Sequence, residues 1–541
     1  MQTLLLSAFE GNFAVATFWA FVPALIAITL ALITKQVYLS LFSGIFVGAM
    51  FLGNGNPIYA IGIIFEVMSA KIDVGILAFL IILGIIVILL QKSGGSKAYG
   101  DWASRKIKSK NGALGATAAL GCLIFVDDYF NCLTVGSVMR PVTDKYKVSR
   151  AKLAYIIDAT AAPVCIIAPI SSWAAAVSGE IAGNGLIVFI MTIPFNLYAL
   201  LTLGFIFYNA FSNFDFGKMK KNEKAAADGD LLAGETELPS EDVSGLVINE
   251  RGKVRHLIIP ILVLIVCCVL AMVYVGFFYD WDAEVLTTTF QGGTVIDAFA
   301  NTNSSLALAI GSTVALIIIV IYYSLEKVVS FKDCMGSFTE GFKSMVPAIF
   351  ILVFAWTISG IMGAKGGYLD AKAFIQTTIG GSNFPLGLLP FIFFVLACGI
   401  AFATGTSWGT FGVLIPLATT FYVVDGVVPG TVQVFLLVAA ILSGAVFGDH
   451  ISPISDTTIM ASSGAQCNHV DHVKTQLPYA GLVAIVAGVS FLALGFILNN
   501  VSNYGLAVAI TLAFGFALLA GTIAVIRVIQ VKKAKKAQAT D

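Results

Sequence analysis

The amino-acid sequence predicts an all-α polytopic membrane protein. Of its 541 residues, 58% are hydrophobic and only 11% are charged. Many apolar runs reach the roughly 20 residues that an α-helix needs to cross a bilayer. They are continuous rather than alternating, which favours helices over membrane β-strands. The formal net charge is zero, so the lipid bilayer is an expected partner and nucleic acid is not.

Single crossings are expected where an apolar run carries few charges. They lie near residues 13–34, 37–53, 74–91, 151–178, 186–211, 256–278, 303–323, 346–363, 431–467, 478–499 and 505–527. No Lys or Arg precedes the first run, so we expect no secretory signal peptide.

Segments 112–139 and 386–424 are different, because each has polar residues in its middle. Basic clusters flank segment 112–139 on both sides, and the positive-inside rule places both clusters in the cytoplasm. We therefore interpret 112–139 as a re-entrant hairpin from the cytoplasm and 386–424 as a hairpin from outside. This topology puts the N-terminus outside and the C-terminus, with its basic tail, in the cytoplasm. The membrane is predicted to be a bacterial cytoplasmic membrane.

Residues 212–255 divide the chain into two halves. They hold nine acids and seven bases and few large apolar side chains, which is typical of a flexible cytoplasmic linker. The first half, 1–211, has scaffold helices in 13–72, the hairpin 112–139 and a broken helix 151–178. The second half, 256–541, has scaffold helices in 256–323, the hairpin 386–424, a broken helix 431–467, and an extra C-terminal helix.

Short motifs recur between the halves in the same order. Ser-Gly-Gly at 93–95 corresponds to Lys-Gly-Gly at 365–367, Thr-Val-Gly at 134–136 to Thr-Phe-Gly at 410–412, and Pro-Ile-Ser at 169–171 to Pro-Ile-Ser at 453–455. Each repeat would have five crossings and one hairpin. Because five is odd, the second repeat is predicted to be inverted in the membrane, with binding at the midplane.

The two hairpin tips and the two broken helices place polar side chains in apolar surroundings. A charged side chain near the bilayer centre is costly and normally functional, and helix breaks free backbone carbonyls for an ion. The donors are nearly all oxygen, which hard cations prefer. The predicted ion-binding and coupling residues are Asp449, Asp456, Asp128, Asp127, Asp158, Asn131, Ser171, Ser172, Ser455 and Thr457. Possible substrate-binding residues are Thr404, Thr406, Ser407, Thr410, His450, Trp173 and Trp408.

Each of these residue types also has a structural alternative. A Ser or Thr in a membrane helix can bond the carbonyl of the preceding turn, and a Trp can simply pack. Asp158 can pair with Arg150, Lys152 or a neighbouring helix, and His450 can relay protons or bond a backbone carbonyl. Asp127 and Asp128 are adjacent, so a helical tip cannot aim both at one point, and Asp128 is favoured as the ligand.

Other polar groups are expected to be solvated. The spacing of Cys467, His469, Asp471 and His472 matches no strong metal-site motif, so we interpret it as a solvated helix end and expect no structural metal. Glu180 is expected near the outer interface in water.

Three segments resemble the NhaC sodium/proton antiporter family. They are Gly-Asp-His-Ile-Ser-Pro-Ile-Ser-Asp-Thr-Thr at 448–458, Phe-Val-Asp-Asp-Tyr-Phe-Asn at 125–131 and Ala-Pro-Ile-Ser-Ser-Trp at 168–173. The resemblance covers roughly residues 70–500 and places the chain in the ion-transporter superfamily. It implies inverted repeats, re-entrant hairpins, a homodimer formed by scaffold helices, and elevator-like motion of a transport domain. It also implies that the hairpin tips and helix breaks hold sodium and any organic substrate.

The predicted function is secondary-active sodium/proton antiport, in which both ions compete for one carboxylate cluster. The alternative is a sodium- or proton-coupled transporter of a small carboxylate or amino acid, which the hydroxyl-rich segment 404–410 favours. An ion channel is a further alternative. An intramembrane aspartyl protease is disfavoured, because Val446 stands where its motif needs Gly and the Pro-Ala-Leu at 23–25 lies at the wrong end. The chain has no ATP-binding P-loop, so we expect ion gradients, not an enzymatic reaction or a cofactor, to drive it.

Overall fold

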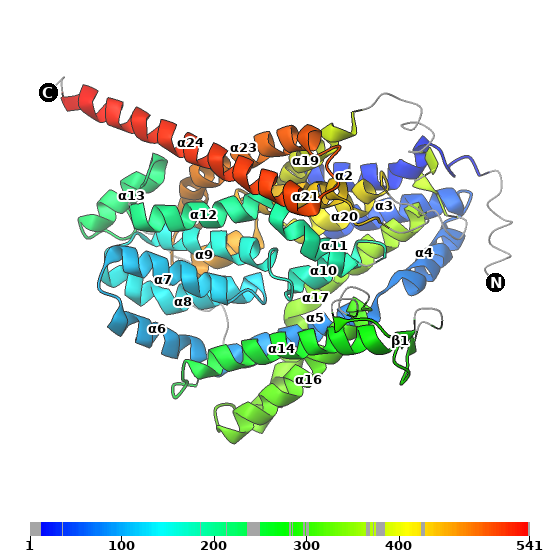
Figure 1. Ribbon diagram of the computed structural model, residues 1–541, viewed down its shortest axis with the longest axis horizontal. Coiled ribbons are helices and arrows are strands. Elements are labelled where there is room, and N and C mark those ends of the chain that lie inside the picture. The colour runs from blue at the N-terminus through cyan, green and yellow to red at the C-terminus, as the bar shows by residue number, and fades with distance from the viewer. Residues whose placement is uncertain are drawn as a thin grey trace.

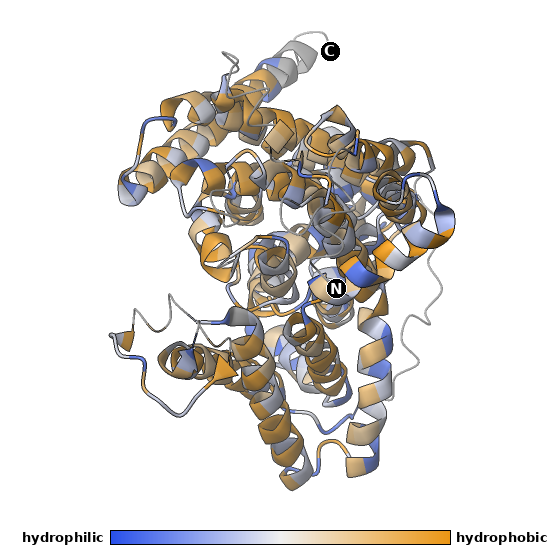
Figure 2. Ribbon diagram, turned by 90° about the vertical axis from the view of Figure 1, so that its right-hand side faces the viewer, coloured by the Kyte–Doolittle hydropathy of each residue, from blue (hydrophilic) through white to orange (hydrophobic). Residues whose placement is uncertain are grey.

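The computed structural model is almost entirely helical (Figure 1). It describes residues 12–34, 36–183, 185–212, 214–234, 249–280, 283, 285–295, 298, 302–363, 368–371, 373–374, 385–422 and 428–538. Within this part, eight helices are long and apolar enough to cross a membrane, or up to ten if two bent pairs each form one span. The prediction of an all-α polytopic membrane protein is therefore confirmed. Figure 2 shows apolar residues along most helices, with hydrophilic ones concentrated near turns and chain ends.

The first half contains helices of very different lengths. They are η1 (Phe18–Phe21), α2 (Val22–Thr34), α3 (Val37–Leu52), α4 (Pro57–Lys71), α5 (Val74–Lys92), α6 (Gly95–Lys106), α7 (Lys110–Leu123), α8 (Asp128–Lys145), α9 (Arg150–Cys165), α10 (Ser172–Gly179), α11 (Gly185–Thr192), η2 (Ile193–Phe195) and α12 (Leu197–Ser212). The α3–α4 pair bends by 113°.

The second half begins after α13 (Gly217–Ala227). It contains α14 (Arg255–Phe278), the short strands β1 (Tyr279–Asp280) and β2 (Val285–Leu286), α16 (Ser304–Leu325), α17 (Phe331–Met362), η3 (Leu386–Leu388), α19 (Leu389–Thr404), α20 (Ser407–Thr419), α21 (Val432–His450), α22 (Asp456–Ala465), α23 (His469–Ile497) and α24 (Tyr504–Gln538). The two strands pair antiparallel, with Tyr279 opposite Leu286.

Packing divides the helices into two groups. In the scaffold group, α5 packs against α16 and α17, α14 packs against α16, and α3 packs against α2, α4 and α17. In the central group, α9 packs against α7, α8, α12 and α22, and α21 packs against α19, α20 and α23. Figure 1 shows α14 and α16 along the opposite side of the molecule from α23 and α24. The central group contains three of the four segments in which polar residues were predicted and α9 of the fourth, whose other helix, α10, packs mainly on α11 and α5.

Helices α7 and α8 form a hairpin whose two open ends meet. Tyr146, just after α8, donates a hydrogen bond of 2.6 Å to the carbonyl of Ile107, just before α7. The Lys110 ammonium donates to the carbonyl of Lys147 at 3.4 Å. The closed end lies between Leu123 and Asp128, where the chain leaves one helix and enters the next. From which side of the membrane this hairpin enters remains a prediction.

Helices α19 and α20 form a second pair with a sharp turn between them. Gly405 ends α19 with φ of +67°, in the left-handed region that favours glycine. A Cβ on Gly405 would lie 2.5 Å from the carbonyl oxygen of Ile454, in the break between α21 and α22. This turn therefore packs directly on the second helix break. Of the predicted hairpin, residues 423–424 lie outside the described residues, as does the Lys-Gly-Gly motif at 365–367.

The first part of the predicted flexible linker is an ordered helix that packs on the rest of the protein. Residues 217–227 form α13, and its side with Met219, Asn222, Glu223 and Ala226 is buried. The spacing of these residues matches one face of a helix, and the face carries polar groups that find partners. The Glu223 carboxylate accepts from the Ser149 backbone N–H at 2.8 Å and pairs with the Lys110 ammonium at 2.6 Å.

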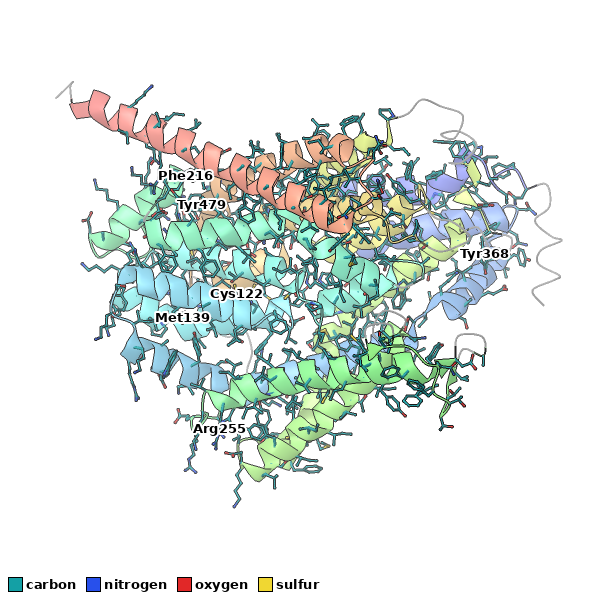
Figure 3. All side chains as sticks on the ribbon, viewed as in Figure 1. Cys122, Met139, Phe216, Arg255, Tyr368 and Tyr479 are labelled. Carbon is teal, nitrogen blue, oxygen red and sulfur yellow. The ribbon has the colours of Figure 1, made fainter. Side chains whose placement is uncertain are left out.

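Helix α13 also contacts the second half of the chain. Asn222 donates to Asp471 at 2.6 Å, and Lys218 also pairs with Asp471, at the start of α23. Nearby, Phe216 packs on Tyr479 with ring centroids 4.6 Å apart (Figure 3). Composition alone did not predict this, because the partners of α13 are far away in sequence. Residues 235–248 lie outside the described residues.

Candidate functional site

The tip of the first hairpin aims two adjacent carboxylates in different directions. Asp127 caps α8 by accepting from the backbone N–H of Phe130 at 2.9 Å, as a residue at a helix N-cap commonly does. Asp128 is fully buried and accepts a hydrogen bond of 3.1 Å from the indole N–H of Trp173 on α10. The backbone geometry thus gives Asp127 a structural bond and leaves Asp128 facing side chains of other helices.

The second helix break joins two further carboxylates. Asp456, the first residue of α22, accepts a hydrogen bond of 2.6 Å from the hydroxyl of Tyr129. Asp449, near the end of α21, accepts from the Thr457 hydroxyl at 3.1 Å, and the same hydroxyl lies 3.1 Å from that of Ser455. The structure therefore connects the first hairpin tip to the second helix break, as the sequence reasoning expected of these segments.

Asp158 belongs to a separate polar network on α9. One of its carboxylate oxygens accepts from Gln476 at 2.6 Å and Thr458 at 3.0 Å, and lies 3.3 Å from the His472 ring. Of the structural alternatives, the two pairs with basic residues do not occur, since Lys152 pairs with Asp215 at 2.7 Å and Arg150 pairs with Asp144 at 2.7 Å. The third alternative, a partner on a neighbouring helix, is the one that the structure shows. Gln476 also donates to the carbonyl of His450 at 2.6 Å, so this network reaches the second helix break.

The ring of His450 contacts α12. Its Nδ1 atom is 3.0 Å from the hydroxyl of Tyr198, and the residue is 1% exposed. His472 is fully buried, and Asp471 is 3% exposed. The expectation of a solvated helix end is therefore wrong for these two residues, because Asp158 and α13 supply them with buried partners.

Several residues that were predicted to bind ions instead form hydrogen bonds with backbone groups at the hairpin tip and the first helix break. Asn131 donates to the carbonyls of Gly121, Ile124 and Thr160 at 2.7, 2.9 and 3.2 Å, which holds the hairpin tip closed. Ser171 caps α10 and donates to the carbonyl of Cys165 at 2.8 Å. The backbone N–H of Ser172 donates to the carbonyl of Val126 at 3.0 Å. These contacts fix the tip and the first break against each other.

The hydroxyls of the second hairpin tip also bond the backbone. Thr404 donates to Ile400 O at 2.8 Å and Thr410 to Thr406 O at 2.9 Å. Ser407 donates to the carbonyl of Ala445 at 3.2 Å. Thr406 caps α20 by accepting from the backbone N–H of Gly409 at 3.4 Å. Thr404 and Thr410 thus match the structural alternative of a bond to the preceding turn, whereas Ser407 bonds the backbone of α21 and Thr406 caps α20.

Two tryptophans bring the hairpin tips together. The rings of Trp173 and Trp408 meet edge-to-face with centroids 5.9 Å apart, and Phe411 packs against both. Since Trp173 also bonds Asp128, the second hairpin contacts the carboxylates through this aromatic pair.

The signals for the residues that sequence reasoning missed were weak. Tyr129 stands directly after the two acids, and Gln476 is an amide near the start of an apolar helix, but Thr458 and Tyr198 carry no distinguishing pattern. Only the fold shows that they bond the predicted acids or His450.

Asp128, Asp449 and Asp456 share one electrostatic property. Asp128 and Asp449 are buried and Asp456 is partly buried, and none of the ion pairs among the described residues includes them. One oxygen of Asp449 is buried and accepts no hydrogen bond from the described residues. Buried ionised carboxylates are costly unless they are paired. The arrangement can therefore take up small cations, protons included, to balance its charge.

Comparison with known proteins places these features in context. The profile of the Na+/H+ antiporter family matches residues 173–496. The chain is 38% identical over 508 residues to an uncharacterized protein of Haemophilus influenzae, covering 90% of this chain and 92% of that one. It is 32% identical over 168 residues to a malate-2H(+)/Na(+)-lactate antiporter of Bacillus subtilis, covering 31% and 34% of the two chains. It is 35% identical over 114 residues to the arginine/ornithine antiporter ArcD of Halobacterium salinarum, covering 20% and 22%.

Proposed function

Because this chain belongs to the Na+/H+ antiporter family, we propose that it exchanges sodium ions for protons at the carboxylates of Asp128, Asp449 and Asp456. The observation that carries the proposal is the bond of 2.6 Å between Tyr129 and Asp456. It joins the first hairpin tip to the second helix break, and it brings acids from both halves into one polar region. The transported ions are the sodium and the protons, and no resident cofactor is part of the proposal.

Exchange follows from competition for the same oxygens. When the acids are protonated, they are neutral and stable in apolar surroundings. When sodium enters, it replaces the protons as the neutralising charge. A carrier whose site opens to one side at a time, and moves only when neutralised, then couples the two ion gradients. The charges of these acids interact strongly in low-dielectric surroundings, so the three carboxylates release their protons as a coupled group rather than independently.

The two packing groups support elevator-like motion as the means of alternating access. Asp128, Asp449 and Asp456 lie in the central group, and the scaffold group contacts it where α2 packs on α19 and where α17 packs on α20. A displacement of the central group along the scaffold would carry the site across the membrane as a unit.

A second candidate is coupled transport of a small organic acid or amino acid at the same site. The Bacillus subtilis and Halobacterium salinarum relatives favour it, because the names of both describe exchange of organic solutes. The hydroxyls at 404–410 do not add support, since each bonds the backbone. The indole N–H of Trp408 is buried without an acceptor among the described residues, and it is an available donor for a carboxylate.

A flux measurement separates these functions. The purified full-length chain is placed in lipid vesicles, and an inward sodium gradient is imposed with a pH-sensitive dye inside. We expect sodium to drive proton efflux without any organic solute, and Asp449→Asn to stop it. Proton movement that appears only after adding malate, lactate, arginine or ornithine would reject pure sodium/proton exchange in favour of the second candidate.

A further inference from the structure

Glu180, directly after the last residue of α10, is a buried carboxylate that the exchange mechanism does not use. It is 5% exposed, and both carboxylate oxygens are buried and accept no hydrogen bond from the described residues. No ion pair among those residues includes it either. The expectation of a solvated side chain is therefore wrong. Buried polar groups without partners are rare in native proteins and need an explanation.

Glu180 lies where α10 meets one scaffold helix and the second hairpin. A Cβ on Gly412 of α20 would be 3.9 Å from its Oε1 atom and 3.1 Å from the Cβ of Ala355 on α17. The indole nitrogen of Trp356, also on α17, lies 3.1 Å from where a Cβ on Gly179 would stand. That indole N–H is itself buried with no acceptor in the described part of the chain. Two hydrogen-bond acceptors, the carboxylate oxygens of Glu180, and one donor, the indole N–H of Trp356, thus lie without partners among the described residues where α10, α17 and α20 meet.

No cation among the described residues pairs with Glu180. Lys71, the last residue of α4, lies against Gly360 of α17, one turn after Trp356, and its side chain is exposed. Residues 349–362 of α17 and all of α20 contain no titratable side chain, and the titratable residues of α16 are Tyr322 and Tyr323, which pack near His256. On α5, Ile76 lies next to Gly179. Asp73, the N-cap residue of that helix, accepts hydrogen bonds from the Ile76 backbone N–H and from the Ser305 hydroxyl.

A cation must therefore neutralise Glu180 whenever it is ionised. Sodium needs several oxygen ligands, whereas the groups that meet Gly412 and Gly179 at this boundary include the Ala355 methyl group and the Trp356 indole. A proton needs only the carboxylate.

The position of Glu180 relates it to the central acids. Trp173 precedes it by seven residues, two turns or about 10 Å along the same face of α10. Trp408 precedes Gly412 by one turn on α20. The seam between α10 and α20 therefore has Asp128, bonded to Trp173, at one end and Glu180 at the other.

We propose that Glu180 is a second proton-binding group, on the seam between α10, α17 and α20. It takes up a proton to become a carboxylic acid and gives the proton back to water when the seam opens. One transport cycle then moves one proton more than the central acids exchange. This inference rests on the proposed function for its role in transport, but the protonation of Glu180 can be observed without transport.

The test compares Glu180→Gln with the wild-type chain in lipid vesicles. Gln has the shape of the protonated acid but cannot release a proton, so the variant should fold. The number of protons moved per sodium ion, obtained from the gradients at which net flux reverses, should fall by one. Glu66→Gln is the matched control, because Glu66 is an exposed carboxylate on α4, and its ratio should not change. Glu180→Asp should restore the wild-type ratio with a shifted pH profile.

Infrared difference spectra of the same samples, taken between acidic and alkaline pH, provide the independent readout. The wild-type chain should show a carboxylic-acid carbonyl band that Glu180→Gln loses and Glu66→Gln keeps. An unchanged band together with an unchanged proton-to-sodium ratio would overturn the inference. A wild-type chain that moves no protons with sodium, yet shows the band, would reject the proposed function alone. If Glu180→Gln does not fold, the band and pH profile of Glu180→Asp decide.

Discussion

The hydroxyl of Tyr129 donates a hydrogen bond of 2.6 Å to the carboxylate of Asp456, across 327 residues of sequence. Tyr129 stands in the first turn of α8, and Asp456 is the first residue of α22. The contact unites the two segments that most clearly interrupt the apolar pattern of this chain. It also gives Asp456 a donor that favours its ionised form, which is the form that binds a cation.

Replacing Tyr129 by Phe should weaken sodium binding while the protein still folds. The ring stays, but a hydrogen bond to a charged group, worth about 1.5–3 kcal/mol, is lost. Since about 1.4 kcal/mol is a factor of ten, the sodium concentration for half-maximal exchange should rise roughly tenfold or more. Tyr59→Phe, on the exposed side of α4, is the control. Equal sodium dependence in both variants would show that the Tyr129 bond has no role in ion binding.

Asp449→Asn and Asp456→Asn should each abolish sodium-driven proton movement without preventing insertion or purification. Asn keeps the size and one acceptor oxygen but can neither hold the charge nor exchange the proton. In the wild-type chain, apparent sodium affinity should weaken as pH falls, because protons compete for the same oxygens. Asp101→Asn, an exposed acid on α6, should behave like wild type. If either site variant keeps wild-type sodium affinity and pH dependence, that residue is structural, and Asp128 and Asp158 are the next candidates.

Both open ends of the α7–α8 hairpin should face the cytoplasm. Single cysteines at positions 108 and 147, in a cysteine-free background, should react only with reagent applied from the cytoplasmic side. The reason is the basic residues that flank both ends, together with the contact between Tyr146 and Ile107 that keeps the ends adjacent. Labelling of one position from outside would exclude a re-entrant hairpin here.

Gly136→Ala should destabilise the chain, because α8 and α22 touch at this glycine. A Cβ there would lie 2.5 Å from the backbone carbon of Gly464. Forcing the helices apart should cost about 1–3 kcal/mol and lower the thermal unfolding temperature. Gly62→Ala is the matched control, since nothing lies within 4 Å of its added methyl group, and it should be neutral or slightly stabilising. Equal unfolding temperatures for the two variants would contradict this account of the packing.

Local patterns in the sequence predicted the helical class and the segments that hold the polar residues. Hydropathy is a property of a short window, and so are the flanking Lys and Arg residues. Asp128, Asp449 and Asp456 were found this way, because acids in apolar runs are conspicuous.

Several partners of these residues could not be predicted, because they are hundreds of residues away in the sequence. Gln476 bonds Asp158 across 318 residues, and nothing near either residue indicates it. The same is true of Glu180, whose neighbours come from α17 and α20. The hydroxyls of Thr404 and Thr410 show the converse case, since a pattern that suggested a ligand site is explained by bonds within the helix.

Helix α13 determines which parts of the molecule can move independently. A loose tether limits only how far two bodies can separate, whereas α13 is bonded to the starts of α7 and α9 on one side and to α23 on the other. These helices must therefore travel together as one rigid block. The surfaces of α2 and α3 on one side and of α19 and α20 on the other meet around a small, largely apolar pocket. It is lined by Ala27, Ile28, Ser40, Leu41, Ile400, Thr404, Gly409 and Val413. Helix α13 thus acts as a brace with charged and polar attachments to both halves, in contrast to the largely apolar contact around this pocket.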